Sequence, residues 1–243
     1  MQPSSVSGRL VIASDPDALA RRVAEWFTET VEATSGMVRV ALSGGSTPKA
    51  LYTILAEKPF VARIPWHRME LFWGDERFVP HDDPASNYRM VEQSLLSRAP
   101  IPASCIHPIP VDGTPDDAAR RYEMTLKQIY GGDELISARP FFDIVLLGLG
   151  SDGHTASLIP GQPVLDERKH WVTAVTGGRS EVRITLTYPA IESSRRIAFL
   201  VTGTEKAAAV RAVRAGDEHL PAARIRATGE VIWFMDRAAA GTD

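Results

Sequence analysis

Short apolar runs alternate with longer amphipathic runs along this chain, and the alternation predicts its secondary structure. In residues 16–34 the apolar Leu19, Val23 and Phe27 recur at the three-to-four-residue spacing of an amphipathic helix. Further helices are expected at residues 48–55, 87–96, 115–130 and 204–213. Strands are expected at residues 10–13, 37–42, 69–73, 106–109, 144–147, 171–175, 183–186, 197–201 and 231–234.

Repeated strand–helix alternation is typical of a doubly wound, Rossmann-like α/β fold, with a mainly parallel sheet and helices on both faces. A chain of 243 residues fits one large α/β domain or two small ones. The glycine pairs at residues 131–132 and 177–178 are interpreted as loops rather than linkers. We therefore expect a single domain over residues 1–243, with residues 1–8 and 237–243 as loose termini.

Composition excludes several classes of partner. The net charge is −3, so no basic excess favours nucleic acid. No apolar run approaches the length of about 18 residues that a membrane-spanning helix needs. The only cysteine is Cys105. It shows no metal-ligand spacing with His67, His81, His107, His170 or His219, nor do these histidines with one another, so no metal site is expected. Residues 1–8 lack the pattern of a signal peptide, which favours a cytoplasmic protein. We expect a monomer, with a homodimer as the alternative.

The first candidate site is the segment LSGGSTP, residues 42–48, between a predicted strand and a predicted helix. Gly44 and Gly45 allow a tight turn and a close approach to a ligand, and Ser46 and Thr47 add hydroxyl groups. The free N–H groups of a helix start bind anions, so the segment is suited to a phosphate. It is not a Walker A loop. The alternative is a plain β–α turn in which Thr47 is the N-cap and Pro48 opens the helix.

The second candidate is WGDERFVP, residues 73–80, which places Asp75 and Arg77 at the end of a predicted strand. A guanidinium group binds a phosphate or a carboxylate through two parallel hydrogen bonds. The alternative is a solvated charge cluster in which Arg77 neutralises its acidic neighbours. Asn87, farther along, is interpreted as a helix cap rather than a ligand contact.

The third candidate follows the most apolar strand and contains Asp152 and His154. Histidine accepts or donates a proton near neutral pH, and Asp152 is placed to fix its orientation or tautomer. The alternative is a histidine satisfied by local backbone. GLGSDG, residues 148–153, matches the dinucleotide pattern GxGxxG. A dinucleotide site needs a long helix after the last glycine, but a helix opened by Thr155 would end at Pro160 after about two turns. Such a site also needs an acidic residue at the end of the next strand, and none is found there. No nucleotide cofactor is therefore expected.

Two further cations complete the candidate set. Arg183 precedes the apolar residues of a short strand, and Lys206 lies in the first turn of a helix within VTGTEKA, residues 201–207. A lysine there is unfavourable for the helix dipole. Either a bound anion or the adjacent Glu205 offsets that cost.

Together, the segments LSGGSTP, WGDERFVP, LLGLGSDGHTASLIPG, RITLT and VTGTEKA stand in an order that resembles the 6-phosphogluconolactonase family, over residues 10–234. The resemblance implies one α/β domain related to the glucosamine- and galactosamine-6-phosphate isomerases. It also implies hydrolysis of 6-phospho-D-glucono-1,5-lactone to 6-phospho-D-gluconate in the oxidative pentose phosphate pathway, without a cofactor. The implied partner is therefore a small sugar-phosphate lactone.

The resemblance assigns roles to individual residues. His154 matches the histidine that activates water, and Asp75 and Arg77 match the acid and the arginine of the Gly-Asp-Glu-Arg segment. Lys206 matches a lysine on the phosphate side and Arg183 an arginine on the substrate side. The sugar-phosphate loop is matched by Gly44, Gly45, Ser46 and Thr47.

Two alternatives use the same fold. In amino-sugar-phosphate deaminases and isomerases, an Asn-Glu-Pro sequence supplies a group for opening the sugar ring, whereas this chain has Leu158, Ile159 and Pro160 at the matching positions. Those enzymes also have a sequence similar to Met-Asp-Glu-Tyr at the positions where this chain has Gly-Asp-Glu-Arg, residues 74–77. A non-catalytic sugar-phosphate-binding regulator is the second alternative, and the chain shows no DNA-binding appendage in its favour.

Overall fold

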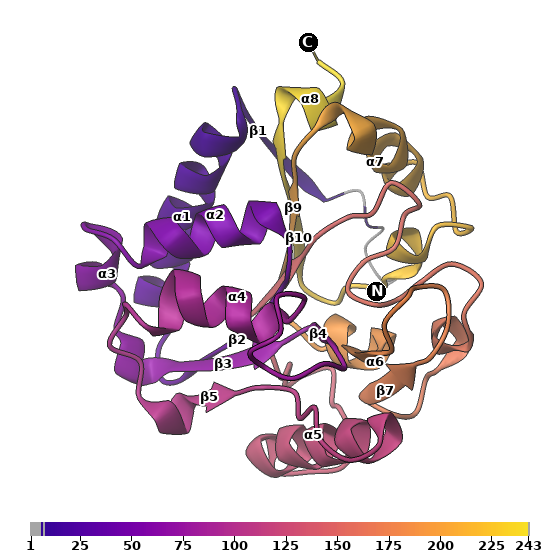
Figure 1. The fold of residues 1–243 in the computed structure, drawn as a ribbon. Coiled ribbons are helices and arrows are strands. Elements are labelled where there is room, and N and C mark those ends of the chain that lie inside the picture. Colours follow the sequence, from indigo (N-terminus) through magenta and orange to yellow (C-terminus); the bar gives the residue numbers. More distant parts are fainter. Residues whose placement is uncertain (1–5, 7, 243) are drawn as a thin grey trace.

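The main sheet has the strand order β1-β10-β9-β6-β2-β3-β5, and every pair in it is parallel (Figure 1). The structure is a computed structural model that describes residue 6 and residues 8–242. The strands of this sheet are β1 (Arg9–Ala13), β2 (Val38–Leu42), β3 (Met69–Trp73), β5 (Ile106–His107), β6 (Ile144–Leu147), β9 (Arg196–Val201) and β10 (Glu230–Asp236). The predicted, mainly parallel sheet is therefore confirmed.

The strand order reverses direction between β2 and β6. From β2 the chain proceeds outward through β3 to β5, and from β6 it proceeds the other way through β9 to β10. Loops that leave two such strands diverge and open a crevice at the carboxyl edge of the sheet. The segments after β2 and β6 are the ones for which the sequence predicts chemistry.

Helices cover both faces of this sheet, with α1 and α2 on one side and α7 on the other (Figure 1). Helix α1 begins where predicted because Asp15 accepts a hydrogen bond from the backbone N–H of Ala18 at 2.8 Å and Pro16 opens the first turn. The α-helices are α1 (Pro16–Ala33), α2 (Ser46–Leu55), α3 (Phe60–Arg63), α4 (Asn87–Val91), α5 (Pro115–Tyr130), α6 (Tyr188–Glu192), α7 (Ala207–Arg214) and α8 (Arg237–Ala240).

A second, smaller sheet contains two of the strands that were expected in the main parallel sheet, β7 (Val172–Val175) and β8 (Arg183–Leu186). It consists of β4 (Asp75–Arg77), β8 and β7, in the order β4-β8-β7. Both pairs are antiparallel, and α5 packs against this sheet. The expected bounds of β8 were right, but β7 and β8 do not join the main sheet.

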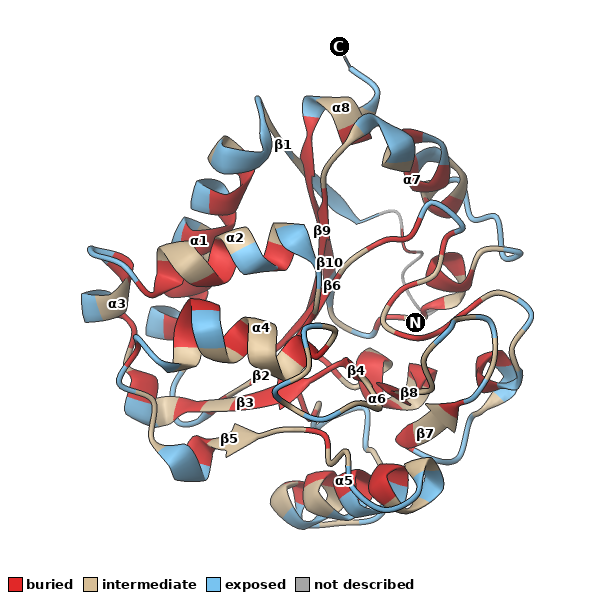
Figure 2. Ribbon diagram, viewed as in Figure 1, coloured by how far each residue is buried: buried red, intermediate tan, exposed pale blue. Residues whose placement is uncertain are grey.

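The core is continuous across the main sheet. Every residue of β6 is buried, as expected for a parallel strand covered on both faces (Figure 2). The rings of Phe199 and Trp233 stack with centroids 4.1 Å apart between β9 and β10. Within residues 6 and 8–242, no helix is long and apolar enough to cross a bilayer.

Three expectations about bounds need correction. The helix expected at residues 87–96 is α-helical only through Val91 and continues as a π-helical turn to Leu96. The strand expected at residues 106–109 is limited to Ile106–His107. The C-terminal residues 237–243 are not all loose, because Asp236 caps helix α8 through a 2.8 Å hydrogen bond from Ala239.

Among residues 1–8, which were expected to be loose, Val6 packs against the core. Residues 1–5 and 7 lie outside the described residues. Val6 is buried, and its carbonyl oxygen accepts a 2.7 Å hydrogen bond from the indole of Trp233.

Candidate active site

One cavity of about 330 Å³ opens at the carboxyl edge of the main sheet, between the loops that follow β2 and β6. A volume of this size matches a small-molecule site. The candidate residues come from five separate segments of the chain, and the fold brings all but one of them to this cavity. Those that line it are Gly44, Gly45, Ser46, Thr47, Asp75, Arg77, His154, Arg183 and Lys206. Asp152 does not line the cavity and instead contacts His154.

The loop after β2 ends in an uncapped helix start. Gly45 is the N-cap of α2, with φ of 104°, and no side chain accepts a hydrogen bond from the first turn. The expected N-cap, Thr47, is wrong because the helix begins two residues earlier than expected, at Ser46 instead of Pro48. The Thr47 hydroxyl instead pairs with that of Thr202 at 2.8 Å. The first N–H groups of α2 have no intrahelical acceptor and border the cavity, which is the geometry of an anion site.

Gly44 is required by a close approach to α4. A Cβ atom on Gly44 would lie 2.0 Å from Oδ1 of Asn87, which is 2% exposed. Asn87 donates from Nδ2 to the carbonyl oxygen of Asp75 at 2.8 Å. The interpretation of Asn87 as a cap is therefore wrong: Ser86 caps α4, and Asn87 lines the cavity and connects β4 to the loop after β2.

Glu76, between the two predicted site residues of β4, has a structural role. It is 1% exposed and accepts hydrogen bonds from the backbone N–H groups of Arg77, Asn87 and Tyr88 and from the hydroxyl of Ser86. Burial raises the pKa of its carboxyl group, although these hydrogen bonds oppose the shift. Glu76 therefore fixes the start of α4 beside the site.

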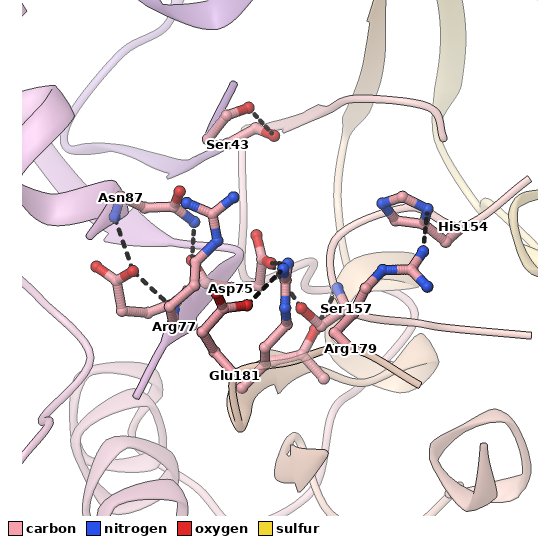
Figure 3. A network of polar contacts seen from close by, with 12 residues as sticks. Ser43, Asp75, Arg77, Asn87, His154, Ser157, Arg179 and Glu181 are labelled. Atoms are coloured by element: carbon pink, nitrogen blue, oxygen red, sulfur yellow. Dashed lines mark hydrogen bonds and ion pairs between the residues drawn. The ribbon is translucent and has the colours of Figure 1, made fainter. Parts of the chain in front are cut away.

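The carboxylate of Asp75 is buried beneath the cavity. Its Oδ2 accepts a 2.7 Å hydrogen bond from the hydroxyl of Ser157 and lies 3.9 Å from Nη1 of Arg183 (Figure 3). Ser157 itself is positioned by β8, since its backbone N–H donates to the hydroxyl of Thr185 at 3.1 Å. Asp75 thus connects three of the segments that form the cavity.

Arg77 and Arg183 lie directly opposite each other across the β4–β8 pair. Like charges at such a position are destabilising. Arg77 donates to the carbonyl oxygen of Ala85 at 2.6 Å, and within the described residues it pairs with no carboxylate, so it does not neutralise its acidic neighbours as the alternative required. The Nε atoms of both arginines are buried without a hydrogen-bond partner. An anion in the cavity would reduce the repulsion between the two guanidinium groups and could accept hydrogen bonds from them.

The remaining cation, Lys206, ends the 3₁₀ turn η5 (Thr204–Lys206) just before α7. Gly203, with φ of 97°, allows the preceding turn. In the part of the chain that the structure describes, Lys206 makes no ion pair, and Glu205 beside it does not neutralise it. Arg183, by contrast, forms ion pairs with Asp75 at 3.9 Å and with Glu181 at 3.7 Å, and burial lowers its pKa.

His154 is held by two neighbours, of which the sequence indicated only one. Its Nδ1 lies 2.5 Å from Oδ1 of Asp152, as the orienting role predicted. Arg179, from the loop between β7 and β8, contacts Oδ2 of Asp152 at 2.6 Å. Its Nη2 also lies 2.9 Å from Nδ1 of His154 (Figure 3). A carboxylate oxygen only accepts, so the contact of the ring with Asp152 is a hydrogen bond in the tautomer that carries its proton on Nδ1. That tautomer leaves the lone pair of Nε2 free to accept a proton.

The charge state of Asp152 supports this tautomer. Burial acts to raise the pKa of Asp152, but hydrogen bonds from Arg179 and His154 outweigh it and hold the pKa well below its ordinary value. Gly150 provides the space for this arrangement, because a Cβ atom there would lie 2.0 Å from Nδ1 of His154. The ring is therefore not satisfied by local backbone alone.

The segment after His154 forms no helix. Thr155, expected as a helix cap, donates from its hydroxyl to the carbonyl oxygen of Gly148 at 2.8 Å, and residues 150–158 form turns. A helix packed on the last glycine, which a dinucleotide site needs, is absent from these described residues.

Comparisons with known proteins agree with the geometry. The family model "Glucosamine-6-phosphate isomerases/6-phosphogluconolactonase" matches residues 14–233. The chain is 40% identical to a 6-phosphogluconolactonase of Synechocystis over 85% of each chain. It is 38% identical to one of Haemophilus influenzae, over 83% of this chain and 86% of the relative.

Solved structures give the same result. The fold matches a 6-phosphogluconolactonase from Trypanosoma cruzi with a TM-score of 0.83 and 30% identity, over 99% of this chain and 97% of that one. A monomeric glucosamine-6-phosphate deaminase shares the fold, with a TM-score of 0.80 over 97% of this chain and 100% of that one, at 22% identity. The chain therefore belongs to the glucosamine-6-phosphate isomerase and 6-phosphogluconolactonase family.

Proposed function

We propose that this protein hydrolyses 6-phospho-D-glucono-1,5-lactone to 6-phospho-D-gluconate in the oxidative pentose phosphate pathway. The observation that carries the proposal is the shared cavity, into which both an uncapped helix start and the ring of His154 open. The names of the relatives support the same substrate. We expect the reaction to take place in the cytoplasm.

Binding of the phosphate group orients the substrate. The N–H groups at the start of α2 and the ammonium group of Lys206 form one anion-attracting part of the cavity, because neither is neutralised by a described side chain. Each charge-assisted hydrogen bond contributes about 1.5–3 kcal/mol net. Two or three of them fix the sugar with its lactone carbonyl beside His154.

Nε2 of His154 then removes a proton from water, and the oxygen of that water attacks C1 of the lactone. The carbonyl oxygen becomes an oxyanion, which the guanidinium of Arg77 stabilises. When the intermediate collapses, the bond between C1 and the ring oxygen breaks, and the imidazolium returns its proton to that oxygen. A general base of this kind contributes about 10²–10⁴-fold, and positioning of the substrate adds to it.

The residues after His154 oppose a deaminase or isomerase reaction. Leu158 and Ile159 are 0% and 2% exposed and pack into the core. Neither can transfer the proton that ring opening needs, whereas lactone hydrolysis needs only the one base. A sugar-phosphate-binding regulator would not need His154 oriented by Asp152 toward a solvent-accessible cavity, so the oriented base favours the enzyme.

The experiment is a coupled assay with freshly prepared 6-phosphogluconolactone beside glucosamine-6-phosphate. We expect turnover of the lactone well above its spontaneous hydrolysis and no release of ammonia from the amino sugar. Turnover of glucosamine-6-phosphate alone would favour the deaminase. Binding of both ligands with no turnover of either would favour the regulator.

A further inference from the structure

Arg179 contacts both His154, the proposed base, and Asp152, the acid that orients it. The guanidinium lies within 2.9 Å of the ring nitrogen and within 2.6 Å of the carboxylate that orients it. It comes from a loop 25 residues farther along the chain. It does not line the cavity, whereas His154 does. Arg179 therefore touches the base and its orienting acid without reaching the space for substrate.

Asp152 alone would create a problem for a base. A carboxylate 2.5 Å from an imidazole stabilises the imidazolium form, and an imidazolium cannot remove a proton from water. A positive charge at 2.9 Å from the same ring opposes that effect. Asp152 thus favours a proton on Nδ1, while the opposite charges of Asp152 and Arg179 compensate at the ring.

We infer that Arg179 is a positioning residue that keeps His154 neutral, and therefore able to act as a base, at pH values where the Asp152–His154 pair alone would be protonated. The inference rests on the proposed function for its kinetic readout. Other charged residues also face the cavity and contribute to the electrostatic potential at His154, but a substitution of Arg179 leaves them unchanged. They are Asp75, Arg77, Arg183, Glu205 and Lys206. Behind the turn, the apolar Leu220 packs on Gly153.

The test compares the pH dependence of kcat/KM in the wild type and in Arg179→Met. Loss of the guanidinium charge should move the acid limb of the profile to higher pH by about half to one unit, because charges at this distance in a partly exposed site interact modestly. Arg179→Lys, which retains the charge, should remain closer to the wild type. Asp152→Asn should move the limb the opposite way, to lower pH.

A matched control is Arg22→Met on α1, where the arginine pairs with Glu25 at 3.3 Å on an exposed surface. It should leave the acid limb in place. An unchanged limb in Arg179→Met, with kcat lowered equally at every pH, would assign Arg179 a structural role and overturn the inference. A rise in KM alone would assign it to substrate binding and overturn it equally.

A second measurement separates this inference from the proposed function. The pH dependence of the ring ¹⁵N chemical shifts of His154 can be followed without substrate, and its midpoint should rise in Arg179→Met. A chain with no lactonase activity would refute the proposed function, while these shifts would still test Arg179. An unaltered midpoint in an active enzyme would refute the role of Arg179 alone.

Discussion

The contact between Gly44 and Asn87 allows a sharp test of how the site is assembled. In Gly44→Ala the new methyl group would lie 2.0 Å from Oδ1 and 2.5 Å from Cγ of Asn87, whereas ordinary contacts begin near 3.4 Å. The buried amide must therefore move by more than 1 Å, which breaks its 2.8 Å hydrogen bond to the carbonyl oxygen of Asp75.

The expected cost follows from these two effects. Overpacking a well-filled site and leaving a buried carbonyl without its donor each cost about 1–3 kcal/mol, so Gly44→Ala should lower the free energy of unfolding by about 2–6 kcal/mol. Asn87→Ala loses the same hydrogen bond and should cost about 1–3 kcal/mol. In the double variant the obstacle to the methyl group is gone, so its cost should match that of Asn87→Ala alone.

Urea unfolding of the wild type, the two single variants and the double variant measures this coupling. Gly148→Ala is a matched control in the same cavity wall, since a Cβ atom there meets only Oγ of Ser43, at 3.9 Å. It should cost less than about 1 kcal/mol. If the costs of Gly44→Ala and Asn87→Ala simply add, within about 0.5 kcal/mol, the two residues are not in contact and the described geometry of the loop is wrong.

Three further predictions concern the catalytic and binding groups. His154→Gln should lower kcat by about 10²–10⁴-fold while product affinity, measured by calorimetry, changes little; undiminished turnover would remove the assignment of the base. Lys206→Ala should mainly raise KM for the phosphorylated lactone, and an unaltered KM would reject its contact with phosphate. The ionised Asp152 should stabilise the fold above an ordinary aspartate pKa and lose that contribution as pH falls, because its pKa is depressed in the folded state. The difference in urea unfolding free energy between the wild type and Asp152→Asn should therefore shrink from about pH 7 to about pH 3.5, and a constant difference would contradict the pairing.

The alternation of apolar runs was enough to predict the main sheet. Each parallel strand is a short apolar run between amphipathic helical segments, and this pattern can be recognised in the local sequence. The local sequence does not indicate which sheet a strand joins. Strand β8 was located correctly at Arg183–Leu186, yet its antiparallel pairing with β4 depends on partners more than a hundred residues away.

The site was predictable where residues are adjacent in sequence and unpredictable where they meet across loops. Asp152 and His154 are two residues apart, so their contact could be inferred from spacing. Arg179 approaches them from another loop, 25 residues from His154, so no local spacing indicated this contact. Asn87 was misinterpreted because the residue that caps α4 is its neighbour, Ser86, and nothing in the local sequence indicates that Gly44 packs against its side chain.

The most direct test of the account is an experimental structure of the protein with 6-phosphogluconate bound. Its central claim is that the start of α2 and the ring of His154 act on opposite ends of one sugar phosphate. The account predicts the phosphate group within hydrogen-bond distance of the backbone N–H groups at residues 46–47, and the C1 carboxylate beside Nε2 of His154. A product bound with its phosphate against His154, or bound outside this cavity, would contradict it.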